Sequence, residues 1–361
     1  MNSNRKERIL KQMQHHEIDQ LILSDPDTLN YLTGIHIAPG ERMMVLLLCA
    51  DGEATLFLNK LFPLSSDPGF PVIGFDDTED PVALLAGELS PIGTVGIDKN
   101  WSARFLLPLM ETLPGLTYRI GSACVDACRM RKDDDEINAM MQSSQLNDKA
   151  IGQLIQELKP GMTELDACER LKKIYAELGA EGTSFDPLIC FGAGGAEPHH
   201  DSDHTHLEEG MAVIIDIGCI ADSYCSDMTR SFFFGTPDAE YQTVHNIVHG
   251  AWKAAFETVK PGIPLKMVDA AARSFIEKAG YGPFFTHRTG HGIGLSVHEF
   301  PDVSAVSETI AEPGMVFSIE PGIYLPGKFG VRIEDLVVVT ENGCESLNHF
   351  SKNALHSEIC F

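Results

Sequence analysis

The chain has 361 residues, 43% of them hydrophobic and 22% charged, which is enough for one large globular domain or two ordinary ones. Its 27 Lys and Arg against 52 Asp and Glu give a net charge of −25, which argues against nucleic acid or an anionic membrane as a partner. No apolar run approaches the ~20 residues of a membrane span, and nine scattered cysteines without CxxC spacing indicate reduced thiols, so we expect a cytoplasmic protein.

The first part of the chain alternates short apolar runs with helical patterns. Apolar runs at 43–50 and 54–58 flank an Asp51-Gly52 turn, which is typical of a β-hairpin. Further short runs follow up to residue 98. These features predict a small α/β domain over residues 1–125.

A long helical pattern begins after residue 132, where three consecutive aspartates suit the positive end of a helix dipole. Apolar residues then recur at helical spacing from Ile137 to Leu158. We place a domain boundary just before this helix, so residues 126–361 are expected to form a second, larger domain.

The second part contains a weak internal duplication. A Lys-Pro-Gly turn at 159–161 recurs at 260–262, and an amphipathic helical pattern follows each turn. The apolar faces that we expect of the two helices consist of Leu165, Cys168, Leu171, Tyr175 and Leu178 in the first, and Met267, Ala271, Phe275 and Ala279 in the second. Related half-domains of this kind predict a site on a pseudo-twofold axis.

Each half then places a carboxylate in an apolar, strand-like run. Asp216 lies in GMAVIIDIG and Glu320 in GMVFSIEPG, each six residues after its Gly-Met pair. A second acid follows in each half, Asp227 in YCSDMTRSFFF and Glu334 in GVRIEDLVVV. If each pair lies on neighbouring antiparallel strands, four carboxylates meet inside the domain, where unpaired charge is strongly unfavourable.

Compensation for this charge can come from arginines or from metal ions. Arg230 and Arg332 supply two positive charges at most, whereas two divalent ions would cancel all four negative charges. Nitrogen ligands are available in THRTGHGIGLSVHE, which holds His287, His291 and His298. His291 stands between glycines, so its ring could approach an ion closely. One imidazole with four carboxylates suits manganese, cobalt, iron or zinc and favours a dinuclear hydrolase.

The motifs DIGCIADSYCSDMTR, THRTGHGIGLSVHE, SIEPGIYLPG and GVRIED resemble the metal-ligand motifs of the pita-bread metallopeptidases. This is the family of Xaa-Pro dipeptidase (prolidase), aminopeptidase P and methionine aminopeptidase. The resemblance implies an α+β pita-bread catalytic domain with a pseudo-twofold duplication, preceded by a creatinase-type α/β domain. It also implies that Asp216 and Asp227 hold one metal ion. His291, Glu320 and Glu334 would hold a second ion, with Asp227 and Glu334 bridging the two.

The resemblance further implies roles in peptide hydrolysis for residues around the metal ions. Glu320 would accept and return a proton while a hydroxide between the two ions attacks the peptide carbonyl. His199 and His298 correspond to substrate-side histidines, and Arg332 to an arginine beside the last glutamate. Manganese is the expected metal, with cobalt, zinc or iron as alternatives.

Several features favour the prolidase-like branch of the family: the preceding α/β domain, PHH around His199, and VHEFP after His298. One departs from it, because some prolidases carry an arginine after that proline, proposed to meet the dipeptide carboxylate, and this chain has Asp302. We therefore expect an Xaa-Pro dipeptidase, with an aminopeptidase for longer peptides as the alternative and a non-catalytic binding protein as a weaker one. The family also implies a homodimer acting on small peptides.

Other histidines have plainer interpretations. We expect His287 to be structural or to support the metal ligands. His200, His204 and His206, with Asp201 and Asp203, could bind adventitious metal, but a solvated loop explains them better.

Overall fold

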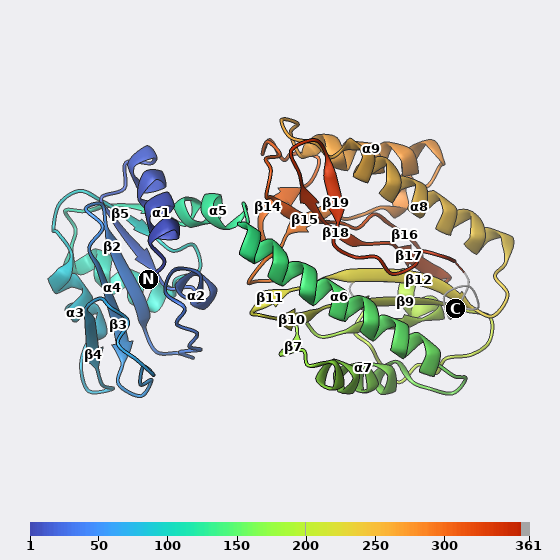
Figure 1. Ribbon diagram of the computed structural model, residues 1–361, viewed down its shortest axis with the longest axis horizontal. Coiled ribbons are helices and arrows are strands. Elements are labelled where there is room, and N and C mark those ends of the chain that lie inside the picture. The colour runs from blue at the N-terminus through green and yellow to red at the C-terminus, as the bar shows by residue number, and fades with distance from the viewer. Residues whose placement is uncertain (199, 355–361) are drawn as a thin grey trace. The chain divides into compact units, whose positions relative to one another are not determined.

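The protein, described by a computed structural model over residues 1–198 and 200–354, divides into two compact units (Figure 1). Unit 1 comprises Met1–Arg129 and unit 2 comprises Met130–Phe361. No helix in the described part of the chain combines the length and the apolar character that crossing a membrane requires.

Unit 1 is a six-stranded mixed sheet with helices. The strands, in the order β4-β3-β2-β1-β5-β6, are β1 (Gln20–Leu23), β2 (Met44–Cys49), β3 (Ala54–Asn59), β4 (Val72–Phe75), β5 (Thr94–Ile97) and β6 (Thr117–Ile120). The helices are α1 (Ser3–His15), α2 (Pro26–Thr33), α3 (Pro81–Glu88), α4 (Ala103–Thr112) and α5 (Ala123–Arg129). Strands β2 and β3 form the expected hairpin, and Gly52 in its turn has a φ of 89°.

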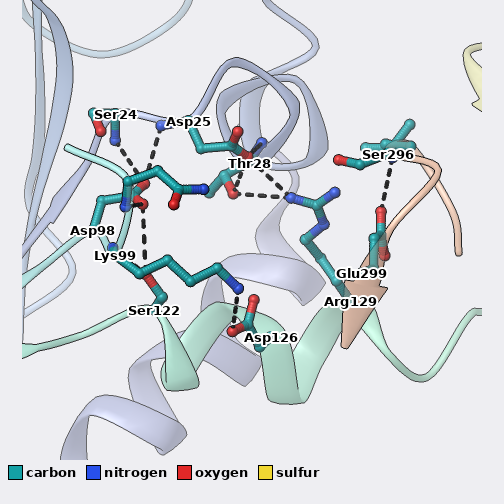
Figure 2. Close-up of polar contacts among 12 residues, drawn as sticks. Ser24, Asp25, Thr28, Asp98, Lys99, Ser122, Asp126, Arg129, Ser296 and Glu299 are labelled. Atoms are coloured by element: carbon teal, nitrogen blue, oxygen red, sulfur yellow. Dashed lines mark hydrogen bonds and ion pairs between the residues drawn. The ribbon is translucent and has the colours of Figure 1, made fainter. Parts of the chain in front are cut away.

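A polar network fixes the connection after β1 in unit 1 (Figure 2). The buried carboxylate of Asp98 accepts the backbone N–H groups of Ser24 and Asp25 at 3.1 and 3.0 Å. Asp25 caps α2 by accepting the N–H of Thr28, and it also accepts a hydrogen bond from Arg129 at 3.1 Å. Both carboxylates are thereby hydrogen-bonded, and Asp25 is also ion-paired with Arg129.

The first half of unit 2 begins with two packed helices and continues into antiparallel strands. The elements are α6 (Asp134–Glu157), α7 (Glu164–Leu178), β7 (Gly182–Thr183), β8 (Leu188–Phe191), the 3₁₀ turn η1 (Gly192–Ala196), β9 (Met211–Ile217), β10 (Cys219–Ala221), β11 (Tyr224–Cys225) and β12 (Met228–Phe234). Helix α6 starts with a capping box between Asp133 and Glu136, as its acidic first turn favours.

The second half repeats this plan. Its elements are α8 (Ala239–Thr258), α9 (Lys266–Lys278), the 3₁₀ turn η2 (Gly282–Phe284), β13 (Gly290–Gly292), β14 (Glu299–Val303), β15 (Val316–Ile319), β16 (Gly322–Leu325), β17 (Phe329–Arg332), β18 (Asp335–Val339) and β19 (Cys344–Ser346). The strands form a five-stranded sheet, β14-β13-β15-β18-β19, and the hairpin β16-β17.

Each half packs one helix pair against its own strands (Figure 1). Helices α6 and α7 bury apolar side chains against β8, β9 and β12, and helices α8 and α9 bury theirs against β15, β17 and β18. Strands β9 and β15, which carry the two related apolar runs, therefore lie against equivalent layers. The duplication expected from the sequence is present in the fold.

The expected apolar face of α9 is wrong by one residue. Met267 and Phe275 are 49% and 41% exposed, whereas Val268, Asp269, Ala272 and Ile276 face inward. Asp269 lies on the inner face because Arg273 pairs with it from the next turn at 2.9 Å, and a buried charge hides that face from a purely hydrophobic pattern. In α7, Leu165 is likewise exposed while Cys168, Leu171 and Tyr175 are buried as expected.

Candidate metal centre

The four acids approach one another because their strands pair as expected. Strands β9 and β12 are antiparallel, with Asp216 opposite Thr229, and Asp227 immediately precedes β12. Strands β15 and β18 are antiparallel, with Ile319 opposite Asp335. Glu320 and Glu334 are the neighbours of these two residues at the paired strand ends. Each half of unit 2 thus delivers two carboxylates to the same region.

His291 lies among these acids. Ligand atoms of Asp227, His291 and Glu334 lie within 4.8 Å of one another. The Nε2 atom of His291 is 3.6 Å from Asp227 Oδ2 and 3.6 Å from Glu320 Oε1. Its Nδ1 atom is 3.1 Å from the carbonyl oxygen of Gly292, which assigns the proton to Nδ1. The lone pair of Nε2 is therefore directed at the carboxylates.

The backbone around His291 needs glycine. A Cβ on Gly290 would overlap the carbonyl oxygen of Ser318, and one on Gly292 would lie 2.5 Å from the carbonyl oxygen of Phe300. The N–H of His291 donates to the Ser318 hydroxyl at 3.0 Å, and that hydroxyl is 3.3 Å from Glu320 Oε1. This close packing of β13 on β15 fixes the imidazole beside Glu320.

Burial and mutual repulsion raise the pKa values of three of the acids. Burial, with the charges of Glu334, Asp216 and Glu320, raises the pKa of Asp227 well above its ordinary value. Burial also raises the pKa of Glu320 to about 7 and that of Glu334 well above normal, the latter with the charges of Glu320 and Asp216. Burial lowers the pKa of His291 to about 3, so its ring is neutral. Such a set is unfavourable without positive charge.

Three buried carboxylate oxygens test whether a cation fits. Asp216 Oδ1, Asp227 Oδ1 and Glu334 Oε1 have no hydrogen-bond partner among the described residues. Buried polar atoms are nearly always satisfied, and carboxylate oxygens with a neutral imidazole nitrogen form a ligand set for divalent transition metals. The donors present here fit metal ions.

Arg332 supports this centre from one side. Its Nη2 donates to Asp216 Oδ2 at 2.6 Å and its Nε to Thr229 Oγ1 at 3.1 Å, while the Thr229 hydroxyl donates to Glu334 Oε2 at 2.6 Å. Its Nη1 donates to the hydroxyl of Tyr324 at 2.8 Å. One oxygen of Asp216 and one of Glu334 are thereby held, and their other oxygens are the unpartnered ones.

Sequence reasoning missed Thr229, Tyr324 and Ser318. Thr229 and Ser318 each lie two residues from an acid, Asp227 and Glu320 respectively, so the period-two alternation of strands places them on the same side. That spacing was the available signal. Tyr324 had none, because it reaches Arg332 only through the β16-β17 pairing, in which Gly322 is opposite Arg332.

Arg230 does not compensate the four carboxylates, contrary to one of the options left open by the sequence. It is 1% exposed and pairs with Asp335 at 2.7 Å. Asp335 follows Glu334, so its side chain points to the other side of the strand. Of the two arginines considered, only Arg332 donates to a carboxylate of the four acids.

The candidate histidines have different positions. The ring of His298 is 4.2 Å from that of His291, centroid to centroid, and burial lowers the pKa of His298. His199 lies outside the described residues. His287 Nε2 lies 2.9 Å from the Tyr324 hydroxyl, which puts it one contact away from Arg332.

A second group of possible ligand atoms lies in the first half, in Glu164, His200 and Asp203. Glu164 is fully buried, and its oxygens accept the N–H groups of Phe191 at 2.7 Å and Asp203 at 2.8 Å and lie 3.0 Å from His200 Nε2. These contacts satisfy the carboxylate without an ion. They anchor the loop after β8 to the start of α7.

Asp269 on α9 anchors the corresponding segment of the second half. It is fully buried, binds Arg273 through both oxygens and accepts the hydroxyl proton of Thr289 at 2.8 Å. The carbonyl oxygen of Thr289 accepts the N–H of Glu320 at 2.8 Å, and His291 follows two residues later. A buried acid on a helix thus supports the segment bearing the imidazole.

Comparisons with known proteins agree with this architecture. Residues 138–341 match the family described as "Metallopeptidase family M24", and residues 5–131 match the family described as "Creatinase/Prolidase N-terminal domain". An uncharacterized peptidase of Staphylococcus haemolyticus is 36% identical over 353 residues, covering 96% of this chain and 99% of the relative.

Two solved structures are similar along nearly their whole length. A dipeptidase from Pyrococcus horikoshii has a TM-score of 0.91 at 33% identity, covering 97% of this chain and 99% of its own. A recombinant prolidase from Thermococcus sibiricus has a TM-score of 0.92 at 32% identity, covering 98% and 99%. The expected fold class, a creatinase-type α/β domain followed by a pita-bread catalytic domain, is confirmed.

Proposed function

Because the chain belongs to metallopeptidase family M24, we propose that this peptidase hydrolyses the Xaa-Pro bond of dipeptides, using two divalent metal ions held by residues of its catalytic domain, 126–361. The observation that carries this proposal is the convergence of four carboxylates on one neutral imidazole, with three buried carboxylate oxygens that have no hydrogen-bond partner in the described part of the chain. The similarity to a dipeptidase and a prolidase supports the substrate class.

We assign Asp216 and Asp227 to one ion. Asp227, His291, Glu320 and Glu334 would hold the other, with Asp227 and Glu334 shared between the two. The ligand chemistry accepts manganese, cobalt, zinc or iron, and we propose manganese. Such ions, when bound, polarise the scissile carbonyl and make a water molecule nucleophilic at neutral pH.

Glu320 is the residue that we propose for proton transfer. Its side chain is 16% exposed, against 6% for Asp227, and unlike the equally exposed Asp216 it is not paired with Arg332, so it can reach a substrate at the edge of the cluster. Hydrogen bonds from the Ser318 hydroxyl to its side chain and from its own N–H to Thr289 hold it in place. It would take a proton from the attacking water and return it to the leaving nitrogen.

Neighbouring residues would bind and orient the peptide. His298, neutral because burial lowers its pKa, can donate a hydrogen bond to the substrate carbonyl, and we propose the same for His199. Arg332 would keep Asp216 oriented through its 2.6 Å contact. A peptide with a free amino terminus at the metal edge is expected as the substrate.

The question of dipeptide or longer peptide depends on the charges around Asp302. This residue is opposite His291 in the β13-β14 pairing, and it forms an ion pair with Arg288 at 2.8 Å. Arg288 is 41% exposed, and its positive charge adds to burial in lowering the pKa of His298 and opposes the rise that burial causes in the pKa of Glu320, so this charge acts within the site. We propose that Arg288 supplies the positive charge that binds the carboxylate of a dipeptide, because Asp302 cannot supply it.

Hydrolysis of Ala-Pro by the manganese-loaded protein tests the proposed site. Asp227→Asn and His291→Ala should each abolish hydrolysis and lower manganese content. Asp203→Asn is the matched control, because it lies in the other group of possible ligands and should leave both unchanged. Wild-type rates in either ligand variant after chelation would contradict the scheme.

An aminopeptidase for longer peptides is the second candidate, and the acidic residue at position 302 favours it. The ratio of activity on Ala-Pro to activity on Ala-Pro-Gly separates the two. We also propose that the protein is a homodimer and that it is located in the cytoplasm. The free thiols of all the described cysteines support the proposed compartment. Light scattering after size-exclusion chromatography tests the dimer.

A further inference from the structure

Arg230 lies in β12 with its side chain directed away from the four acids. Its guanidinium is fully used, donating to the carbonyl oxygens of Glu334 at 2.6 Å and Thr229 at 3.0 Å, and to Asp335 Oδ1 at 2.7 Å. The remaining donors reach the carbonyl oxygens of Phe350 at 2.8 Å and Ser351 at 3.0 Å. Arg230 therefore joins the strands of the candidate metal ligands to residues near the end of the described chain.

The segment that Arg230 holds, residues 348–354, is hereafter called the C-terminal segment. Strand β12 is an edge strand of its sheet, and the N–H of Phe233 donates to the carbonyl oxygen of Ala354 at 2.9 Å. On the other flank, the N–H of Leu336 donates to the Asn348 side chain at 2.8 Å. The C-terminal segment thus covers the edge of β12 and reaches β18.

Lys352 adds a charged contact to this segment. Its ammonium group pairs with Asp335 Oδ2 and lies 4.2 Å above the ring of Trp252. Asp335 is fully buried, and Arg230 and Lys352 both act as its counter-charges. Loss of the segment would remove the Lys352 counter-charge from Asp335 and the carbonyl acceptors of the Nε and Nη2 atoms of Arg230.

The same strand positions also hold the candidate ligands. The hydroxyl of Thr229 donates to Glu334 Oε2 on one side of the strands, while the carbonyl oxygens of both residues accept from Arg230 on the other. The N–H of Glu334 donates to the carbonyl oxygen of Thr229 at 3.1 Å. The contact between the strands of the two half-domains is therefore fixed by Arg230 at the residue that carries the carboxylate.

We propose that Arg230 is a positioning residue that couples docking of the C-terminal segment to metal affinity. This inference rests on the proposed metal site. Docked, the segment completes the hydrogen bonds of Arg230 and keeps Thr229 and Glu334 in register. Undocked, the guanidinium must turn to other acceptors, and the Glu334 carboxylate loses its orientation.

Coupling of this kind is reciprocal. If docking of the segment raises metal affinity by some factor, metal binding raises the docking equilibrium by the same factor. Residues that orient metal ligands from behind commonly change affinity by about 10- to 100-fold when replaced. We expect a loss in this range for Arg230→Gln and a smaller one, about threefold, for Lys352→Gln, which loosens the segment without touching β12.

Two measurements on the full chain test the proposal. Calorimetric titration with Mn²⁺ after chelation gives affinity, and hydrogen exchange of peptides covering 348–354 gives docking. In the wild type, Mn²⁺ should slow this exchange. In Arg230→Gln exchange should be fast and insensitive to Mn²⁺. In Lys352→Gln, exchange of the 348–354 peptides should be faster and Mn²⁺ affinity about threefold lower than in the wild type. If Arg230→Gln does not fold, the Lys352→Gln result alone tests the proposal.

Ile276→Ala is the control for general loosening, because it opens a cavity in the core of the second half and removes no hydrogen bond of Arg230 or of the C-terminal segment. Its Mn²⁺ affinity should equal that of the wild type, and an equal loss there would overturn the proposal. Faster exchange in Arg230→Gln and Lys352→Gln with Mn²⁺ affinity within twofold of the wild type would also overturn it. A wild type that binds no Mn²⁺ would instead refute the metal site itself.

Discussion

Removal of metal should reverse the pH dependence that Glu320 contributes to the stability of unit 2. In the metal-free protein burial raises the pKa of Glu320 from 4.5 to about 7. The folded state then binds the proton more tightly than the unfolded state, so this contribution is fully present below pH 4.5 and is lost as pH rises through 7. The rise corresponds to about 3 kcal/mol of unfolding free energy. With metal bound, the ionised form is favoured and stability rises with pH instead.

The assay is urea unfolding of chelated protein between pH 4.5 and 8. Trp252 is the tryptophan of unit 2, so a Trp101→Phe background reports this unit alone. Relative to Glu320→Gln, the unfolding free energy of the wild-type residue should fall by about 3 kcal/mol across this range. With manganese bound, the pH dependence of the difference in unfolding free energy between the two proteins should have the opposite sign.

His245 must be separated from this effect. It is 2% exposed, donates from Nε2 to the carbonyl oxygen of Ser231, and burial lowers its pKa from 6.5 to about 4. Its neutral form is favoured in the folded state, so stability is lost as pH falls from 6.5 to 4, opposite to Glu320 and also by about 3 kcal/mol. His245→Gln removes this term. A chelated wild type whose stability relative to Glu320→Gln is flat or rises with pH would refute the reasoning.

Three further changes test individual contacts. Thr229→Val leaves Glu334 and Arg332 without a shared hydroxyl and should lower Mn²⁺ affinity about tenfold in calorimetric titration, whereas unchanged affinity would contradict its support of the carboxylate. Arg288→Ala should raise KM for Ala-Pro about fivefold with little change for Ala-Pro-Gly, and an equal effect on both would exclude a role at the carboxylate. Asp269→Asn should lower the unfolding free energy by about 2 kcal/mol in urea, and a neutral result would mean that the Arg273 and Thr289 contacts contribute little.

The positions of the acids could be predicted from the sequence because an ionisable residue in an apolar strand stands out against its neighbours. The six-residue offsets of Asp216 and Glu320 from their Gly-Met pairs indicated a duplicated half-domain, and β9 and β15 occupy equivalent layers. Antiparallel pairing then brings the second acids close. These features depend on local pattern and strand periodicity, which a sequence records directly.

Other features depend on contacts between distant segments. The sequence alone left Arg230 and Arg332 equivalent as counter-charges, but alternation along a strand directs Arg230 and Thr229 to opposite sides, and only the pairing of β12 with residues 332–335 shows which side holds the acids. The face of α9 was mistaken because Asp269 is buried by partners from α9 itself and from residue 289. Tyr324 meets His287 and Arg332 only in the folded chain.

The division of the acids between two similar halves has a consequence for how such a protein could originate. Asp216 and Asp227 come from one half of unit 2, and Glu320 and Glu334, with His291, from the other. Each half alone supplies two of the four carboxylates, so neither provides the full set of candidate ligands. A chain the length of one half of unit 2 could build a comparable centre by self-association about a twofold axis. Fusion of two copies would then allow the halves to diverge, one retaining two aspartates and the other acquiring glutamates and an imidazole.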